Sequence, residues 1–213
     1  MKTNIKILVI VSSLLLFMTL FFPIWQIRLE APQYPTPLGL NISVDKIEGM
    51  EDNDLENINL LNHYIGMKEI VADSIPELKF LKYVFYFFIL FGIVVLFSKH
   101  KAFLFGWVVA MTIAGTLLLW DFNKWEKDYG TNLDPTAAIK VEGMTYKPPL
   151  IGKKELLNIT AYSYPYSGGI AFFTSILVAW GAFFIAMNQS PVEESKKISL
   201  PKLTAKRKTF GVG

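Results

Sequence analysis

Four apolar stretches are separated by two long polar segments and one short one, and each stretch is close to the length of a bilayer-spanning helix. A helix needs roughly 20 consecutive apolar residues to cross the hydrocarbon core. The pattern therefore predicts a mainly α-helical membrane protein. Its four transmembrane helices are expected within residues 1–25, 80–98, 102–120 and 169–188.

Lysines near the ends of these stretches predict the orientation of the chain. They lie at Lys2, Lys6, Lys99, Lys101 and in the basic tail, residues 189–213. Because short basic segments stay in the cytoplasm, we expect both termini inside, in a multi-pass protein of the inner (cytoplasmic) membrane. The loops at residues 26–79 and 121–168 are then extracytoplasmic. The first span has no small-residue cleavage site, which favours an uncleaved signal-anchor, and the tail is interpreted as disordered.

Aromatic residues predict the outer boundary of the membrane, since tryptophan and tyrosine favour the headgroup region. The expected belt consists of Trp25, Trp120, Trp125, Tyr164 and Tyr166.

The two loops contain shorter periodic segments, which predict a small α+β domain. Apolar and polar positions alternate as in strands at residues 26–30, 38–47, 138–142 and 156–163. Asn53 and Glu56 are spaced as a capping box, which predicts a helix over residues 54–67. Each loop is too small to bury a core alone, so we expect the two loops to pack together.

A five-residue string recurs in the two loops, 94 positions apart. Residues 46–50 read KIEGM and residues 140–144 read KVEGM. The recurrence indicates either a two-fold duplication of a helix–loop–helix unit or the chance repetition of a turn sequence.

The composition excludes several classes of functional site. The chain has no cysteine, which excludes disulfides, thiolate zinc sites, iron–sulfur clusters and cysteine nucleophiles, and it has only two histidines. No phosphate-binding loop, dinucleotide fingerprint, metalloprotease motif or nucleophile elbow is present. We therefore expect no enzyme activity. The basic tail is expected to touch anionic lipid rather than nucleic acid.

The remaining metal-ligating side chains gather in the loops. On the predicted helix, His63 and Met67 are four residues apart and project from one face. Imidazole and thioether groups suit Cu(I), so these two residues, with Met50 and Met144 from the repeated strings, form the candidate metal site. The alternative is that the methionines fill gaps in a small core and that the histidine has a structural role.

Several strings resemble one family of membrane proteins. They are residues 31–35 (APQYP), 44–49 (VDKIEG), 58–67 (INLLNHYIGM) and 146–152 (YKPPLIG). As a set, they resemble small four-helix membrane accessory proteins encoded with nitrous oxide reductase clusters of the atypical clade. The resemblance implies that the protein supports or matures an extracytoplasmic copper enzyme of denitrification, with a copper protein or copper chaperone as partner. It places His63 and Met67 first among the candidate ligands. The alternative function is a metal-free assembly subunit whose loops dock a partner protein.

Overall fold

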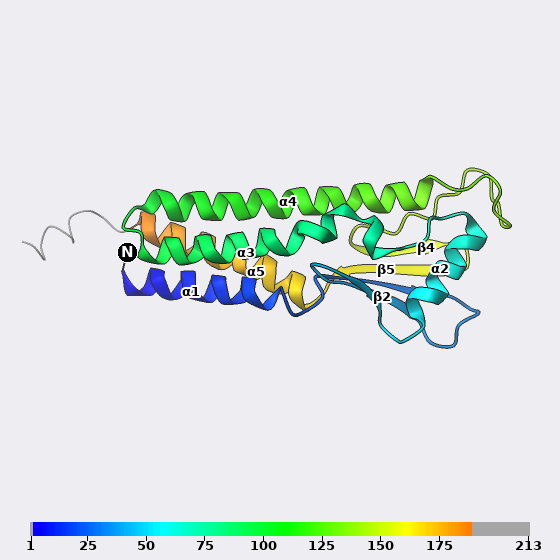
Figure 1. Ribbon diagram of the computed structural model, residues 1–213, viewed down its shortest axis with the longest axis horizontal. Helices are drawn as coiled ribbons and strands as arrows, with labels where there is room; N and C mark the ends of the chain where they lie inside the picture. Colours follow the sequence, from blue (N-terminus) through cyan, green and yellow to red (C-terminus); the bar gives the residue numbers. More distant parts are fainter. Residues whose placement is uncertain (1, 189–213) are drawn as a thin grey trace, which may run out of the picture.

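The computed structural model describes residues 2–188, which form a helical bundle with a small sheet domain at one end (Figure 1). The bundle consists of α1 (Thr3–Met18), α3 (Pro76–Phe97), α4 (Lys101–Thr131) and α5 (Ser167–Met187). The last three helices are long and apolar enough to cross a membrane. Large apolar side chains such as Leu90, Phe97 and Leu177 are exposed on their outer faces. This outward apolar surface is compatible with contact to lipid acyl chains.

Helix α1 is shorter than the first predicted span. It ends at Met18, and residues 19–23 form turns that lead into the first strand at Trp25. Its 16 residues reach about 24 Å at 1.5 Å per residue, which is less than the roughly 30 Å of a hydrocarbon core. A helix that fills residues 1–25 is therefore not observed. Instead, α1 packs along α5, where the buried Ser12 hydroxyl donates to the Ser175 carbonyl oxygen (2.9 Å).

The other three spans begin and end near their predicted positions, with one clear difference. Helix α4 continues for eleven residues beyond the predicted boundary at residue 120, to Thr131. At 31 residues it is about 46 Å long, so its last three turns extend past the bundle and lie beside the sheet domain (Figure 1). We treat residues 102–120 as the membrane-spanning part of α4 and residues 121–131 as part of the sheet domain.

The sheet contains five antiparallel strands drawn from both loops. The first loop provides β1 (Trp25–Glu30), β2 (Leu38–Ile42) and β3 (Ile47–Gly49), and the second provides β4 (Gly152–Leu156) and β5 (Ile159–Pro165). The strand order is β3-β2-β1-β5-β4. Strand β1 pairs with β5 along its whole length, from Trp25 opposite Pro165 to Glu30 opposite Thr160. The prediction that the two loops fold together is thus confirmed.

Two of the segments predicted as single strands contain the turn of a hairpin. Residues 38–47 contain β2 and the start of β3, joined by a turn in which the Ser43 N–H donates to the Lys46 carbonyl (2.8 Å). Residues 156–163 contain the turn between β4 and β5, where Leu157 has a φ of 57°. Both turns contain an apolar residue, Val44 in the first and Leu157 in the second, so the apolar pattern did not mark where the strands end.

Residues 138–142 are not a strand, and the repeated strings have different structures. The first string contains β3, whereas the second is an exposed turn in which Gly143 has a φ of 73°. The second segment is held to the end of α2 by the Ile139 N–H, which donates to the Tyr64 carbonyl (2.9 Å). Residues 138–142 pair with no strand of the five-stranded sheet. The structure therefore does not support a duplication.

Helix α2 (Asp54–Ile65) confirms the predicted loop helix, but not its cap or its last turn. Asn53 makes no side-chain capping bond. Instead, the buried Asp54 carboxylate accepts the backbone N–H groups of Gly39 (2.9 Å) and Glu51 (3.2 Å). The helix ends at Gly66, whose φ of 80° is the left-handed conformation that glycine adopts without steric cost.

The predicted aromatic belt is also wrong at Trp25 and Trp125, since Trp125 packs against the core of the sheet domain with its indole N–H buried. Trp25 lies in the core of the sheet domain, and its indole N–H donates to the Ser163 hydroxyl (2.8 Å). Trp120, Tyr164 and Tyr166 are exposed, as expected of residues at a lipid boundary. The basic tail lies outside the described residues.

Candidate functional site

His63 and Met67 lie on either side of the end of α2. His63 is exposed in the last helical turn, whereas Met67 follows the left-handed Gly66 and donates its backbone N–H to the Asn62 carbonyl (2.8 Å). The predicted placement of both side chains on one continuous helix is therefore wrong. The reversal at Gly66 nevertheless turns Met67 back toward the helix, so both residues border the same depression.

This depression, which we call the His63 hollow, has a volume of about 380 Å³. It is lined by Glu56, Asn57, Asn59, Leu60, His63, Met67 and Glu69. Its polar lining and its position on the domain surface make the imidazole accessible from solvent. An imidazole and a thioether at one open hollow form a soft ligand pair that could share a metal ion with ligands from a second molecule.

Met50 and Met144 do not line the His63 hollow. Met50 follows β3, donates its N–H to the Gly39 carbonyl (2.9 Å) and lays its thioether over the α-carbon of Gly39. Met144 lies in the exposed turn of the second loop, where its N–H donates to the Val141 carbonyl (3.1 Å). Of the four predicted ligands, the structure brings together His63 and Met67. Within residues 2–188, no three His, Asp or Glu side chains form a metal-binding group.

A second, interior cavity of about 70 Å³ lies behind Met67, between the sheet and α4. Met67 lines both this cavity and the His63 hollow, so its side chain separates the surface from the domain core. The remaining lining is apolar except for Asn62, Glu126, Tyr129 and Tyr146. We call this space the Glu126 cavity.

Glu126 is the unexpected residue of the domain. Its side chain is completely buried, and neither carboxyl oxygen has a hydrogen-bond partner among residues 2–188. Burial raises the pKa of Glu126 to about 8, against the opposing effect of Lys147 and Lys154. The Tyr146 hydroxyl is likewise buried without a partner. The cavity thus holds a carboxyl group that favours the neutral acid near neutral pH.

Sequence reasoning missed Glu126 because nothing local distinguishes it. It lies between Trp125 and Lys127, in a polar segment that follows a predicted membrane helix. Its burial depends on α4 continuing as a helix, which turns this position toward the sheet at helical spacing. The signal that could have found it is the recurrence of apolar and aromatic positions at Phe122, Trp125 and Tyr129, which mark the inner face of the extended helix.

Comparisons with known proteins found no matching family model, no matching curated protein and no matching solved structure.

Proposed function

We propose that this protein is a multi-pass protein of the inner membrane that handles Cu(I) on the extracytoplasmic side. It would support or mature a copper enzyme such as nitrous oxide reductase, with a periplasmic copper protein or copper chaperone as partner. In this proposal the apolar segment of residues 3–24 completes a fourth crossing, both termini are cytoplasmic and the sheet domain is extracytoplasmic.

One observation carries the proposal: His63 and Met67 border the same solvent-accessible hollow. Thioether and imidazole ligands favour Cu(I) over harder cations. A pair of protein ligands leaves coordination positions open for ligands of a donor or acceptor protein. The site is therefore better suited to the transfer of copper than to its permanent storage. The glutamates at the rim, Glu56 and Glu69, add negative charge that attracts a cation.

The orientation is supported by the arrangement of the bundle. The start of α1, the turn between α3 and α4 and the end of α5 lie at one end, and the sheet domain lies at the other (Figure 1). Lys2, Lys99 and Lys101 belong to the first end. Basic residues concentrate on the cytoplasmic side of membrane proteins, so the sheet domain is assigned to the opposite side.

The test is an anaerobic Cu(I) titration of the detergent-purified protein against a competing chromophoric chelator. We expect one Cu(I) per chain in the wild type and loss of most of this binding in His63→Ala and Met67→Ala. Met50→Ala and Met144→Ala are matched controls, because both residues lie outside the His63 hollow, and they should bind copper as the wild type does. Unchanged binding in both His63→Ala and Met67→Ala would overturn the proposal.

A second candidate function is metal-free docking, and a different surface favours it. Tyr64 is exposed on α2 beside Ile139 of the second loop, and Ile139 and Val141 are exposed as well. The hydrogen bond from Ile139 to Tyr64 holds the two segments together. Exposed apolar groups gathered on one face are typical of protein interaction sites.

One purification experiment distinguishes the two proposed functions. A copper-free partner that co-purifies in stoichiometric amount, and is lost in an Ile139→Asp/Val141→Asp variant, whose changes lie outside the His63 hollow, supports docking. Copper bound by the isolated protein, and retained in that variant, supports copper handling.

A further inference from the structure

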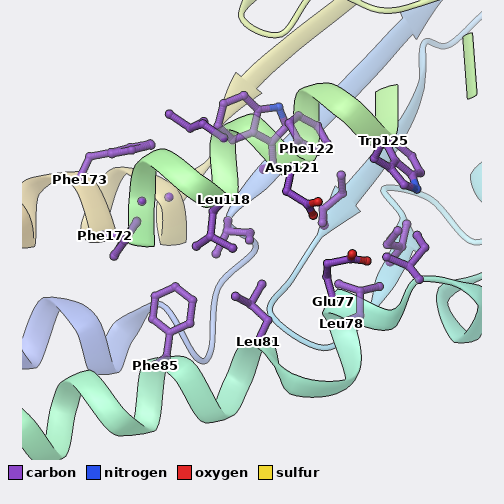
Figure 2. A pocket seen from close by; sticks show the side chains of 18 residues that line it. Glu77, Leu78, Leu81, Phe85, Leu118, Asp121, Phe122, Trp125, Phe172 and Phe173 are labelled. Atoms are coloured by element: carbon purple, nitrogen blue, oxygen red, sulfur yellow. The ribbon is translucent and has the colours of Figure 1, made fainter. Parts of the chain in front are cut away.

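A third cavity lies where the helical bundle meets the sheet domain, and neither proposed function uses it. It has a volume of about 120 Å³ and is lined by residues of α3, α4, α5, β1, β2 and β3. Nearly all of these side chains are apolar. Figure 2 shows this space between α3 and α4, and we call it the boundary cavity.

The chemistry of the boundary cavity changes along the direction of the helices. Glu77, Leu81 and Phe85 follow one another at four-residue spacing on one face of α3, and all three line the cavity. Phe85 therefore lies about 12 Å further along the bundle than Glu77. On α4, Leu118 and Gly115 likewise follow Asp121 in the direction of the bundle. Carboxyl groups thus occupy the end nearest the sheet domain, and apolar side chains occupy the end within the bundle.

Two carboxyl groups face the same space. Figure 2 shows those of Glu77 and Asp121, from α3 and α4, turned into the gap between the two helices. Among the ion pairs of residues 2–188, neither carboxyl group is paired with a lysine or arginine within 4 Å. Two carboxylates in a largely apolar space repel each other, and a cation between them would relieve the repulsion.

The indole N–H of Trp125 is buried and has no hydrogen-bond partner among the described residues. Trp125 lines both the boundary cavity and the Glu126 cavity, one helical turn beyond Asp121 on the side of the sheet domain. The boundary cavity therefore offers a site for a cation at its outer end and a channel for an apolar chain within the bundle.

We propose that the boundary cavity binds a phospholipid with a primary-amine headgroup, of the phosphatidylethanolamine type. The acyl chain lies along Leu81, Phe85 and Leu118, and the ammonium group lies between Glu77 and Asp121. A primary ammonium donates up to three hydrogen bonds, whereas a choline headgroup donates none and a glycerol headgroup has no cation. The order of acyl chain and ammonium group, from the bundle toward the sheet domain, matches the depth profile of a lipid in a leaflet, given that the three long apolar helices cross the membrane.

Native mass spectrometry of the full-length protein tests this proposal. The detergent-purified protein is mixed with equal amounts of ethanolamine, choline and glycerol phospholipids that carry identical acyl chains. We expect the ethanolamine lipid to be retained about tenfold or more over the other two, the factor that one or two charge-assisted hydrogen bonds provide. Equal retention of the three lipids, or preference for the choline or glycerol lipid, would overturn the proposal whatever the variants show.

Two variants then locate the site. Glu77→Gln/Asp121→Asn should abolish the headgroup preference and leave retention of the choline lipid unchanged. Asp73→Asn is the matched control, since this exposed carboxyl is outside the cavity, and it should keep the wild-type preference. A preference that persists in Glu77→Gln/Asp121→Asn shows that the lipid binds elsewhere and overturns the assignment. Thermal unfolding of each variant verifies that it is folded.

Discussion

The carboxylate of Asp54, at the start of α2, accepts the backbone N–H of Gly39 in β2 at 2.9 Å. The same oxygen accepts the Glu51 N–H, so one buried side chain fixes α2 against the sheet and closes the connection from β3. Because the His63 hollow lies on α2, this anchor also determines where the candidate copper ligands stand relative to the sheet.

Replacing Asp54 with alanine is expected to lower the free energy of unfolding by about 1–3 kcal/mol, because it leaves buried backbone donors unsatisfied. Thermal unfolding in detergent measures the change. The exposed neighbour in Asp52→Ala provides the control, and its effect should stay within about 0.5 kcal/mol. Equal effects of the two substitutions would contradict the anchoring role of Asp54.

Trp25 and Ser163 link the first and second loops through a side-chain hydrogen bond of 2.8 Å. The substitution Ser163→Ala leaves the buried indole N–H without a partner and should lower the free energy of unfolding by about 1–3 kcal/mol. Trp25→Phe removes the donor, so Ser163→Ala should cost less in that background than in the wild type. A double-mutant cycle measures the difference, and strict additivity would show that the hydrogen bond contributes nothing.

Gly169, at the start of α5, lies against the backbone carbonyl of Ile24. A β-carbon at Gly169 would overlap the Ile24 oxygen, whereas one at Gly181 would meet nothing within 4 Å. Gly169→Ala should therefore lower the melting temperature, and Gly181→Ala should leave it unchanged or raise it slightly. Both are glycine-to-alanine changes in the same helix, so a comparison of their melting temperatures isolates the close approach. Equal melting temperatures would argue against it.

Glu126 predicts a pH dependence of stability. Burial raises its pKa from an ordinary value of 4.5 to about 8, so the folded protein keeps a proton that the unfolded chain loses between these values. The free energy of unfolding should then fall as pH rises from 4.5 to 8, by up to about 1.4 kcal/mol per pH unit. Below this window both states are protonated and above it both are ionised, so the effect of Glu126 becomes constant.

The substitution Glu126→Gln removes the titration and keeps the shape of the side chain. Relative to the wild type, its melting temperature should increase progressively from pH 5 to pH 8. Glu155→Gln, at an exposed position of β4, is the control and should follow the wild type at every pH. Parallel curves for wild type and Glu126→Gln would rule out a raised pKa at this position.

The helical part of the fold could be predicted because its signal is local. A run of about 20 apolar residues favours a buried or membrane-inserted helix wherever the rest of the chain lies, and α3, α4 and α5 begin close to where the pattern placed them. The same holds for α2. Acidic residues lie in its first turn, from Asp54, and a glycine, Gly66, ends it. Strand boundaries were less predictable, since Val44 carries the apolar alternation of β2 into the turn that follows the strand.

The candidate site could be predicted only in part, for a physical reason. His63 and Met67 are close in sequence, so a single reversal at Gly66 is enough to bring them to one hollow. Met50 and Met144 occur in nearly identical strings, but β3 pairs with β2, whereas residues 138–142 are held to the end of α2. Nearly identical short sequences therefore adopt different conformations, and the predicted equivalence of the two methionines has no structural basis.

The sequence by itself determined the number and position of the apolar stretches, their distribution of charge and the set of soft metal ligands. Only the tertiary structure decided which polar residues are buried: Glu126 faces the sheet because α4 continues beyond the bundle, and Glu77 and Asp121 share a cavity because α3 and α4 lie side by side. These arrangements depend on contacts between residues far apart in the chain. Local propensity and periodicity carry no information about such contacts, whereas packing determines both the burial of a carboxyl group and the charge state that it favours.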